Sequence, residues 1–510
     1  MNELLSPEGM AEADALAVAG GTPGIDLMRR AGLAVADACA RMVPLAARVL
    51  VLAGPGNNGG DGFVAATVLR RRGYRIEVHL LGARERVAGD AALALEEMEA
   101  AGIACTQLTA GGVAASLATA GIVIDALFGA GLARPLTGVV AEAVDLVNLS
   151  ELPVLSVDLP SGVEGGGGTV LGTAIEADRT VTFFRGKPGH YLFPGRRLRG
   201  MLEIADIGIP DEVLHTVHED ARERTWRNDA QLWGMALREP GPGDHKYARG
   251  HVVVVSGPSL STGAARLAAG AALRSGAGLV TVATPPSAAL VNAMHLTAVM
   301  LRKFQGKDGL GDLLSDRRLN AVAIGPGAGA GAGTRELALV ALSSGLRAVV
   351  LDADALTAFE EASGQLAQAI ASRSGKRARD VVLTPHDGEF ARLFGDVDWA
   401  GAPSKLTRAR AAARLTGGVV VLKGPDTVVA APDGRALVND NAPAWLATAG
   451  SGDVLCGIVT GLLAQGAPAF EAAAAAVWLH GRAGVLAGPA LTAEDLEPAL
   501  RLALGEHFAG

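Results

Sequence analysis

Glycine, asparagine and aspartate residues follow an apolar run near the start of the sequence. The stretch GPGNNGGDG, residues 54–62, contains the spacing GxGxxG in Gly54, Gly56 and Gly59. Glycines let a backbone approach a phosphate, and the amides at the start of a helix attract an anion. A helix that starts near Asp61 would therefore create an anion site. The two asparagines have two possible roles. They could be purely structural, because asparagine readily adopts unusual backbone angles in a glycine-rich turn, or they could offer carbonyl oxygens to a cation.

The same stretch does not fit an ordinary dinucleotide-cofactor fingerprint. That fingerprint needs an acidic residue near the end of the second strand, where it binds the ribose. The expected second strand ends in Leu-Leu-Gly at 80–82, and Glu77 lies in its middle. Asp61 also stands where a phosphate would approach the helix. The spacing therefore gives only weak support for a bound cofactor.

Three further loops at expected strand ends carry polar residues and glycines. They are DALFGAGLARP (125–135), DLPSGV (158–163) and FFRGKPGH (183–190). Ligands of open α/β sheets bind beyond the carboxyl ends of the strands, so we expect these loops to converge. Asp125 and Ser161 would add oxygen ligands, and a set of oxygens with few charges suits a hard cation, including a monovalent one. Asp158 is either a turn-capping residue before a proline or a general acid/base.

Similar signals occur in the second half of the chain. The stretch ATAGSGDVLCGIVTGLLAQG (447–466) predicts a glycine turn followed by a helix, with Asp453 in the first helical turn. Amides of such a turn can stabilise a phosphoryl group in transfer, while a carboxylate takes the proton of the attacking hydroxyl. Alternatively, Asp453 has only a structural role, as a negative charge that the dipole favours at the start of a helix. Lys423 is either a phosphate ligand or an exposed turn lysine, and His386 and Glu389 lie at a strand-to-helix junction.

The composition limits the class of protein. The 510 residues exceed one ordinary domain, and 49% of them are hydrophobic, enough for more than one full core. The formal charge is −8 with no long basic run, which argues against a nucleic acid held by general electrostatics. Three cysteines show no metal or disulfide spacing, and Cys456 is expected to be a core residue. The acidic N-terminus lacks a signal-peptide core and no apolar stretch indicates a membrane span, so we expect a soluble cytoplasmic protein.

Two series of short β-branched runs alternate with helical segments. After a helical region at 6–40, the first series of expected strands is 48–53, 75–81, 122–127, 154–159 and 179–184. The second series is 251–258, 278–285, 320–327, 348–356, 380–386 and 418–424. This alternation predicts βαβ units and parallel sheets covered on both faces. A polar region without expected strands separates the series, so we place a domain boundary near residue 220.

The motifs of the first half resemble a known family. LMRRAGLAVA, GPGNNGGDGFVAA, DALFGAGLARPLTG and VDLPSGV, in this order, are similar to the motifs of the NAD(P)H-hydrate epimerase domain, also called the YjeF N-terminal domain. The resemblance covers residues 1–215. It implies a Rossmann-like α/β/α sandwich that binds hydrated NADH or NADPH and interconverts the epimers at nicotinamide C6.

The resemblance also implies roles for residues. Asp158 would be the catalytic acid/base, and Asn58, Asp125 and Ser161 would bind potassium. The dinucleotide would contact Asn57, Asn58, Gly59, Gly60, Asp61, Gly129, Ala130, Gly131, Leu132, Ala133, Arg134, Pro135 and Asp158. Ala130 stands where a common family form has threonine.

The motifs of the second half are similar to those of the ADP-dependent (S)-NAD(P)H-hydrate dehydratase, of the ribokinase-like superfamily. They are HKYARGHVVVVSG, STGAARLAAGAALRSGAGLVTVATP, AIGPGAG, LTPHDGEFARL, VVLKGPDTVV and WLATAGSGDVLCGI. We assign residues 228–510 to this domain and 216–227 to a linker. Ser451 stands where threonine is common, and Asp387 where proline often follows the histidine.

The second resemblance implies a binding site for ADP with Mg²⁺ and for the hydrated dinucleotide. The hydrate would contact Ala265, Gly327, His386 and Asp453, and the nucleotide would contact Lys423, Gly424, Pro425, Asp426, Thr427 and Gly452. Asp453 would be the base that helps ADP to phosphorylate the C6 hydroxyl of the S hydrate. Expulsion of phosphate would then restore NAD(P)H and leave AMP.

Two other classes of function stay open on the sequence. The second domain could be a ribokinase-type kinase for an ordinary alcohol, which ATP-dependent phosphorylation of a vitamin-like alcohol would reveal. The first domain could be a binding module without turnover. The expected partners are small-molecule substrates, with no nucleic acid and no membrane, and we expect a homo-oligomer.

Overall fold

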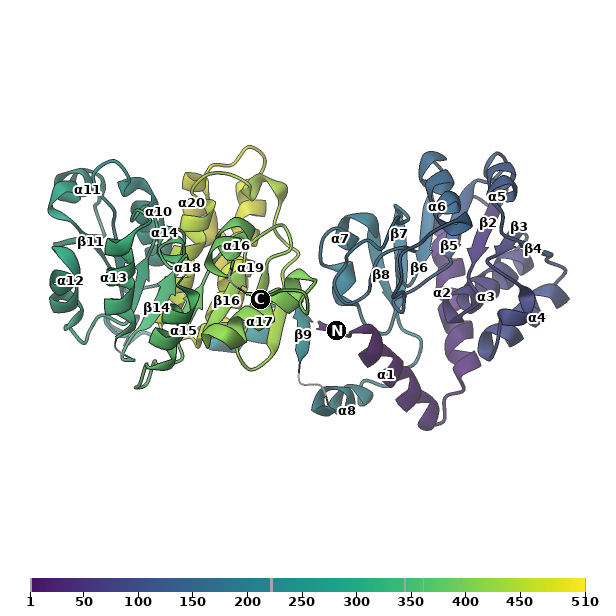
Figure 1. Cartoon of the computed structure of the whole chain (residues 1–510), viewed down its shortest axis with the longest axis horizontal. Coiled ribbons are helices and arrows are strands. Elements are labelled where there is room, and N and C mark those ends of the chain that lie inside the picture. Colours follow the sequence, from purple (N-terminus) through teal and green to yellow (C-terminus); the bar gives the residue numbers. More distant parts are fainter. Residues whose placement is uncertain (1, 221–222, 344, 361, 396, 510) are drawn as a thin grey trace. The chain divides into compact units, whose positions relative to one another are not determined.

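Aliphatic runs form strands close to the predicted positions. The computed structural model describes residues 2–220, 223–343, 345–360, 362–395 and 397–509. The chain divides into two compact units, Met1–Thr225 (unit 1) and Trp226–Gly510 (unit 2), and the division falls inside the segment predicted as a linker. Each unit is an α/β structure, as Figure 1 shows.

Unit 1 is built on a seven-stranded parallel sheet in the order β4-β3-β2-β5-β6-β7-β8. Its strands are β1 (Glu3–Leu4, outside this sheet), β2 (Arg48–Ala53), β3 (Arg75–Leu80), β4 (Cys105–Gln107), β5 (Ile122–Ala126), β6 (Val154–Val157), β7 (Arg179–Phe183) and β8 (Met201–Ala205). Its helices are α1 (Pro7–Ala19), α2 (Gly24–Met42), α3 (Asn57–Arg71), α4 (Asp90–Ala100), α5 (Ala110–Leu117), α6 (Val139–Leu149), α7 (Gly195–Leu198) and α8 (Val213–Asp220). β4 and β8 were not among the predicted strands.

Strand β2 shows why helices cover both faces of this sheet. Successive side chains of a strand point to opposite faces. Val49 and Val51 pack in the core beneath α1 to α4, whereas Leu50 and Leu52 pack with residues of α5 and α6. The uninterrupted apolar run therefore marks a strand that is buried on both sides, as a parallel sheet requires.

Unit 2 contains a mixed sheet in the order β9-β18-β17-β16-β15-β14-β13-β10-β11-β12. Its strands are β9 (Arg224–Arg227), β10 (His251–Val255), β11 (Leu279–Thr284), β12 (Met300–Lys303), β13 (Ala321–Ile324), β14 (Ala348–Leu351), β15 (Val381–Leu383), β16 (Val419–Leu422), β17 (Val428–Ala430) and β18 (Arg435–Val438). The strands from β16 to β12 are parallel, whereas β16, β17 and β18 form an antiparallel meander. Strand β16 was predicted, at 418–424, but β12, β17 and β18 were not among the predicted strands. The region around residue 220 was predicted to lack strands, and β9 contradicts this.

The helices of unit 2 cover its sheet on both faces. They are α9 (Ala230–Trp233), α10 (Thr262–Arg274), α11 (Ala289–His295), α12 (Gly306–Leu314), α13 (Ala332–Leu342), α14 (Asp354–Thr357), α15 (Ser363–Ala371), α16 (Asp387–Leu393), α17 (Lys405–Thr416), α18 (Ser451–Ala464), α19 (Ala469–Ala487) and α20 (Ala493–Ala509). Helices α10, α18, α19 and α20 share one large buried core with the strands. Much of this core is alanine, which lets the helices approach closely.

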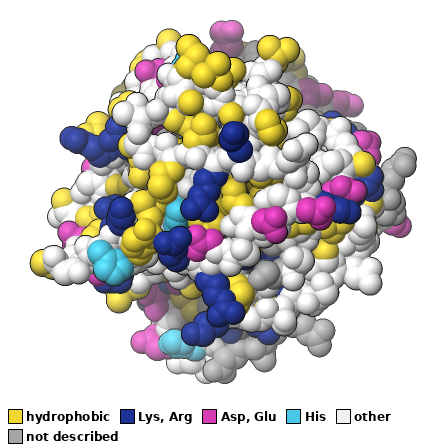
Figure 2. Space-filling view, turned by 90° about the vertical axis from the view of Figure 1, so that its left-hand side faces the viewer, with side chains coloured by type: hydrophobic (Ala, Val, Ile, Leu, Met, Phe, Trp, Pro, Cys, Tyr) yellow, Lys and Arg dark blue, Asp and Glu magenta, His cyan; other side chains and the backbone are white. Residues whose placement is uncertain are grey.

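The surface of unit 2 carries mixed side chains. Figure 2 views the end of the molecule where α11 and α12 lie, and it shows basic side chains scattered among apolar and uncharged ones. Leu290 and Met294 of α11 are both exposed. None of the helices in the described residues combines the length and the hydropathy that crossing a membrane needs.

Candidate active sites

The GPGNNGGDG stretch forms a tight turn from β2 into α3. A Cβ atom at Gly54 would overlap the carbonyl oxygen of Leu127, and one at Gly59 would overlap the carbonyl oxygen of Gly54. Only glycine therefore allows the backbone segments to lie this close. Gly60 packs against α2, because a Cβ there would lie 2.6 Å from Sδ of Met28.

The start of α3 differs from the prediction. The helix begins at Asn57, one turn before Asp61, so Asp61 does not occupy the position at which a phosphate would meet free amides. The Asp61 side chain is only 8% exposed. Burial, together with the negative charges of Asp158 and Asp14, raises the pKa of Asp61 well above its ordinary value. Burial and the neighbouring charges therefore favour the protonated form of Asp61.

A cavity of about 1250 Å³ lies at the carboxyl edge of the unit 1 sheet. Of the predicted dinucleotide contacts, its lining includes Asn57, Asn58, Asp61, Gly129, Ala130, Gly131, Leu132, Ala133, Arg134, Pro135 and Asp158. Gly59 and Gly60 are not among the lining residues; they permit the close packing of α3. The volume lies above the usual range for drug-sized ligands, which suits a dinucleotide.

Asp158 lies at the centre of the polar contacts in unit 1. Its Oδ1 accepts hydrogen bonds from Nζ of Lys187 at 2.7 Å and from Oγ1 of Thr182 at 2.9 Å. Its Oδ2 accepts one from the Ala130 amide at 2.8 Å. A Cβ atom at Gly129 would lie 2.7 Å from Asp158 Oδ2 and 2.9 Å from Asn58 Oδ1, so the fold brings these predicted residues together.

Lys187 keeps Asp158 ionised, and His190 contacts its backbone. Burial would raise the pKa of Asp158, but the charge and hydrogen bond of Lys187 lower it to about 2. Asp158 has a φ of 63°, an uncommon conformation for a residue with a side chain. The His190 ring contacts the Asp158 carbonyl through Nε2 at 2.7 Å and accepts the Lys187 amide at Nδ1. These two contacts fix a neutral ring with its proton on Nε2.

A third carboxyl group, Asp14 of α1, also lines the cavity. Burial raises the pKa of Asp14 to about 6, against the opposing charge of Lys187. The cavity therefore combines the ionised Asp158 with two carboxyl groups, Asp61 and Asp14, whose pKa values are raised.

Two of the three predicted potassium ligands are in direct contact. Asp125 and Ser161 are fully buried, and Ser161 donates its hydroxyl to Asp125 at 2.5 Å. The other donors to Asp125 are the Ser161 amide, the Ser156 hydroxyl and the Leu127 amide at 3.4 Å, so among the described residues this buried carboxyl group has neutral hydrogen-bond partners. The Phe128 carbonyl lies 3.2 Å from the Ser161 hydroxyl. Asn58 could add only its Oδ1, because its Nδ2 is a donor; within the described residues this buried Nδ2 has no hydrogen-bond partner. The oxygen atoms of Asp125, Ser161 and Phe128 form a set that fits a monovalent cation.

In unit 2, Asp453 lies in the first turn of α18, after Gly450 in a left-handed conformation. Burial and the nearby charge of Asp352 raise the pKa of Asp453 to about 7, although Lys423 opposes them. A carboxyl group with this pKa can act as a base near neutral pH.

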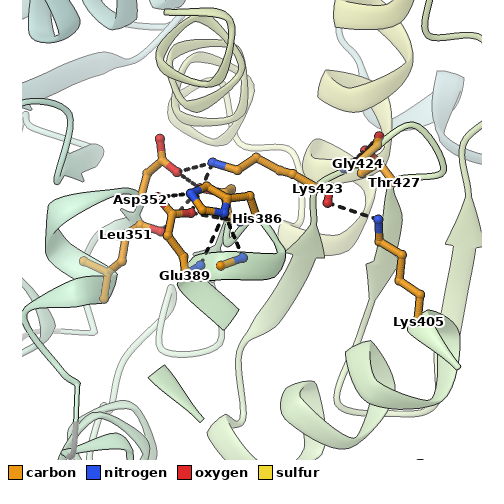
Figure 3. Close-up of polar contacts among 10 residues, drawn as sticks. Leu351, Asp352, His386, Glu389, Lys405, Lys423, Gly424 and Thr427 are labelled. Carbon is orange, nitrogen blue, oxygen red and sulfur yellow. Dashed lines mark hydrogen bonds and ion pairs between the residues drawn. The ribbon is translucent and has the colours of Figure 1, made fainter. Parts of the chain in front are cut away.

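The Lys423 side chain extends toward Asp352 and Glu389, as Figure 3 shows. Its Nζ donates to Asp352 Oδ1 at 2.8 Å and lies 3.6 Å from Oε2 of Glu389. A Cβ at Gly452 would lie 3.4 Å from the same Nζ, so Lys423 reaches the first turn of α18. His386 is the N-cap of α16, where its Nδ1 accepts the Gly388 amide.

The predicted nucleotide-binding stretch 423–427 is a turn that side-chain hydrogen bonds stabilise. Lys405 donates to Asp426 Oδ1 at 2.8 Å and to the Lys423 carbonyl at 3.0 Å. The Thr427 hydroxyl bonds to Gly424 through both its carbonyl and its amide. The side chains of Asp426 and Thr427 therefore support the turn.

Ala265 and Gly327 take different positions. Ala265 of α10 is fully buried in the core of unit 2. Gly327 has a φ of 65°, and Ser261, the N-cap of α10, donates to its carbonyl at 2.8 Å. A hydrogen bond thus connects the Gly327 loop to the start of α10, while the Ala265 side chain packs between helices in the core.

Comparisons with known proteins agree with this arrangement. The family model of NAD(P)H-hydrate dehydratase matches residues 252–500, and that of the YjeF-related protein N-terminus matches residues 24–189. A bifunctional NAD(P)H-hydrate repair enzyme from Moorella thermoacetica is 37% identical, over 91% of this chain and 88% of that protein. One from Synechocystis is 35% identical, over 96% and 93%. The chain belongs to the bifunctional NAD(P)H-hydrate repair enzyme family.

Among solved structures, an ADP/ATP-dependent NAD(P)H-hydrate dehydratase from Bacillus subtilis, co-crystallized with ATP and Mg²⁺, is 28% identical, with a TM-score of 0.46. It covers 55% of this chain and 98% of its own length.

The three departures from the common motifs of the repair enzyme family have local explanations. Ala130 contacts Asp158 through its backbone amide, which any residue supplies. Ser451 keeps a hydroxyl that pairs with Nε2 of the buried His480 at 3.1 Å. Asp387 is exposed in the first turn of α16, where a negative charge complements the helix dipole.

Several residues at the two sites were missed by the sequence analysis. Lys187, Thr182 and His190 surround Asp158, and Asp352 pairs with Lys423. Lys187 and His190 lie in the 183–190 loop, which had been noted as polar, but spacing cannot tell which side chain turns inward. Cys456, predicted as a core residue, is fully buried, and burial raises the pKa of its thiol well above the ordinary value.

Proposed function

We propose that this chain repairs hydrated NADH and NADPH in two steps, one in each unit. Unit 1 interconverts the R and S hydrates at C6. Unit 2 uses ADP to dehydrate the S hydrate and releases AMP and phosphate. The observation that carries the proposal is geometric: Asp158 lines the large cavity of unit 1, and Asp453 lies in the first turn of α18, which Lys423 reaches.

In unit 1, ionised Asp158 accepts the proton of the C6 hydroxyl. The C6–N1 bond then opens with its electron pair on nitrogen, and the resulting aldehyde can rotate. When the bond forms again on the other face, Asp158 returns the proton to the new hydroxyl. Lys187 keeps the carboxylate ionised, and His190 fixes its backbone.

In unit 2, Asp453 accepts the proton of the C6 hydroxyl as its oxygen attacks the terminal phosphorus of ADP, and AMP leaves. The backbone amides at the start of α18 stabilise the charge on the phosphoryl group. The lone pair of N1 then expels phosphate from C6, and loss of a proton from C5 restores the double bond. Lys423 reaches the first turn of α18 and is placed to attract the phosphates.

Two ions belong to the proposal. Potassium, held by Asn58, Asp125 and Ser161, would compensate the buried Asp125 charge and steady the loop beside Asp158. The described residues contain no cluster of three or more His, Cys, Asp or Glu side chains arranged as metal ligands. Mg²⁺ often binds through one or two carboxylates and the substrate phosphates, so it would arrive with ADP near Asp352 and Glu389. A homo-oligomer and a cytoplasmic location stay predictions.

The test uses a mixture of R and S hydrated NADPH with ADP, and it follows the return of NADPH absorbance and the release of AMP. The unmodified protein should restore all of the NADPH. Asp158→Asn should restore the S fraction quickly and then slow to the spontaneous rate of epimerisation. Asp453→Asn should restore none while it still interconverts the epimers. If Asp453→Asn dehydrates normally, the proposed chemistry of unit 2 is wrong.

A further inference from the structure

The end of β3 lacks the acidic residue that binds a ribose in many dinucleotide sites, and an arginine lies there instead. After β3 the chain passes through Leu81 and Gly82 into a short 3₁₀ turn, Arg84–Arg86. Leu81, Gly82 and Arg86 all line the 1250 Å³ cavity. A Cβ at Gly82 would lie 3.9 Å from both Cδ and Nη1 of Arg86, so the arginine side chain folds back over this glycine.

The two arginines of this turn differ in their contacts. Arg84 makes hydrogen bonds of 3.1 and 2.6 Å to the two carboxylate oxygens of Glu99 and does not line the cavity. Within the described residues, no side chain forms a hydrogen bond or ion pair with the guanidinium of Arg86. Arg86 therefore has all its side-chain donors available at the cavity wall.

The strand order places Arg86 at one end of the site and Asp158 at the other. The sheet order is β3-β2-β5-β6, and the loops after these strands carry Arg86, Asn57, the segment 129–135 and Asp158 respectively. Neighbouring strands are about 4.8 Å apart, so β3 and β6 are about 14 Å apart. With the nicotinamide at Asp158, a dinucleotide that follows this edge has its pyrophosphate near Asn57 and its adenosine ribose at the end of β3.

The charges of the cavity explain why an arginine is needed at that end. Asp14, Asp61, Asp90 and Asp158 line it from α1, α3, α4 and the loop after β6. Its basic lining residues are Lys187, which is engaged by Asp158, Arg134 in the loop after β5, and Arg86 after β3. A phosphate on a ribose carries nearly two negative charges near neutral pH, so at the end of β3 it needs a cation, and Arg86 is the cavity-lining basic residue that follows this strand. Arginine presents a planar fork of donors that matches a phosphate. In Rossmann sites, an arginine near the end of the second strand accommodates the 2′-phosphate of NADP.

We propose that Arg86 binds the 2′-phosphate of hydrated NADPH, so that unit 1 prefers hydrated NADPH to hydrated NADH. This inference rests on the proposed epimerase function, because it assumes that the cavity holds the hydrated dinucleotide with its nicotinamide at Asp158. Arg86 acts in substrate recognition and takes no part in the proton transfers.

The experiment measures the conversion of pure R hydrates into S hydrates by the full-length protein without ADP, with the spontaneous rate subtracted. The unmodified protein should have a lower KM for hydrated NADPH than for hydrated NADH. Arg86→Gln should raise the KM for hydrated NADPH roughly 10- to 100-fold, the effect expected for lost hydrogen bonds to a charged group, with little change in kcat. The KM for hydrated NADH should stay the same.

Two further variants separate recognition from structure. Arg84→Gln removes an equal charge two residues away and should leave both KM values unchanged. Arg86→Lys keeps the charge but loses the fork, and it should give an intermediate KM for hydrated NADPH. Equal KM values for the two substrates in the unmodified protein, or equal effects of Arg86→Gln on both, would overturn the inference and leave the epimerase function intact. If the unmodified protein accelerates neither conversion, the epimerase function fails and the inference fails with it.

Discussion

Lys187 decides the charge state of Asp158. The lysine is 1% exposed, and its Nζ is shared between Asp158 and Thr182 at 2.7 and 2.8 Å. Without this cation, burial and the neighbouring carboxyl groups would favour the protonated form of Asp158. The ionised base of unit 1 is thus the product of one buried contact.

Replacement of Lys187 by methionine should shift the pH dependence of epimerisation. The pKa of Asp158 is about 2 in the unmodified protein, so Asp158 is fully ionised throughout pH 5–9. Loss of the lysine should raise this pKa by about 1–3 units or more, and the rate should then fall as the pH drops through the raised value. Lys187→Arg keeps the charge and is the control. The measurement is kcat/KM for R-to-S conversion at pH 4–9, with circular dichroism to verify folding, and a profile identical to that of Lys187→Arg would contradict the prediction.

The dehydration step should depend on pH even in the unmodified protein, because the pKa of its base is raised and not lowered. The pKa of Asp453 is raised to about 7, so a large part of this base is protonated at neutral pH. We expect kcat/KM for ADP-dependent dehydration to rise about tenfold per unit below pH 6 and to level off above pH 8. The assay is NADPH recovery from the pure S hydrate between pH 5 and 9. A rate that does not change over this range would mean that Asp453 is not the base.

At the scale of elements, the turn between β2 and α3 depends on a close backbone approach. A Cβ at Gly59 would overlap the Gly54 carbonyl, whereas nothing lies within 4 Å of a Cβ at Gly56. The same turn presents Asn57 and Asn58 to the cavity. Packing and site geometry therefore share one set of glycines.

Gly59→Ala should lower the free energy of unfolding of unit 1 by roughly 2–4 kcal/mol and abolish most epimerisation, because the backbone must shift. Gly56→Ala lies at the N-cap of the same helix and should cost less than about 1 kcal/mol. Thermal unfolding, together with epimerase and dehydratase rates, tests the pair. A Gly59→Ala protein as stable and as active in epimerisation as Gly56→Ala would show that the close approach is dispensable.

At the scale of the whole molecule, each candidate site is built from the residues of one unit. The cavity of unit 1 is lined by residues between Pro7 and Ile207, and the polar cluster of unit 2 lies between Asp352 and Asp453. Neither set needs a side chain from the other unit. The two reactions should therefore be separable by mutation.

A mixture of two variants, each inactive in one unit, should repair both epimers. Asp158→Asn retains unit 2 and Asp453→Asn retains unit 1, so the S hydrate made by one protein can diffuse to the other. We expect the equimolar mixture to restore all of the NADPH from an R/S mixture, at a rate that rises with protein concentration. The measurement is the rate of NADPH recovery after the S fraction has been consumed, compared with each variant alone. Recovery no greater than that of Asp158→Asn alone would show that the intermediate does not pass between molecules.

The sequence by itself determined most of the buried parallel strands, the two α/β units and the aspartates at the strand ends. Buried parallel strands require continuous apolar runs, and tight turns require glycine, so both leave local signals; the runs that became β2 and β5 are examples. The short strands β17 and β18 left a weaker signal, because an antiparallel meander depends on pairing partners that local sequence does not specify.

Only the tertiary structure decided the state and surroundings of the two aspartates. Asp158 and Lys187 are 29 residues apart, and Asp352 and Lys423 are 71 apart. Such pairs form because parallel strands end at one edge of a sheet, and the pKa of each carboxyl group depends on the burial and charges that result. The same edge sets Arg86 opposite Asp158 along the cavity. Spacing in the sequence carries no information on these distances, since they are set by the order of the strands.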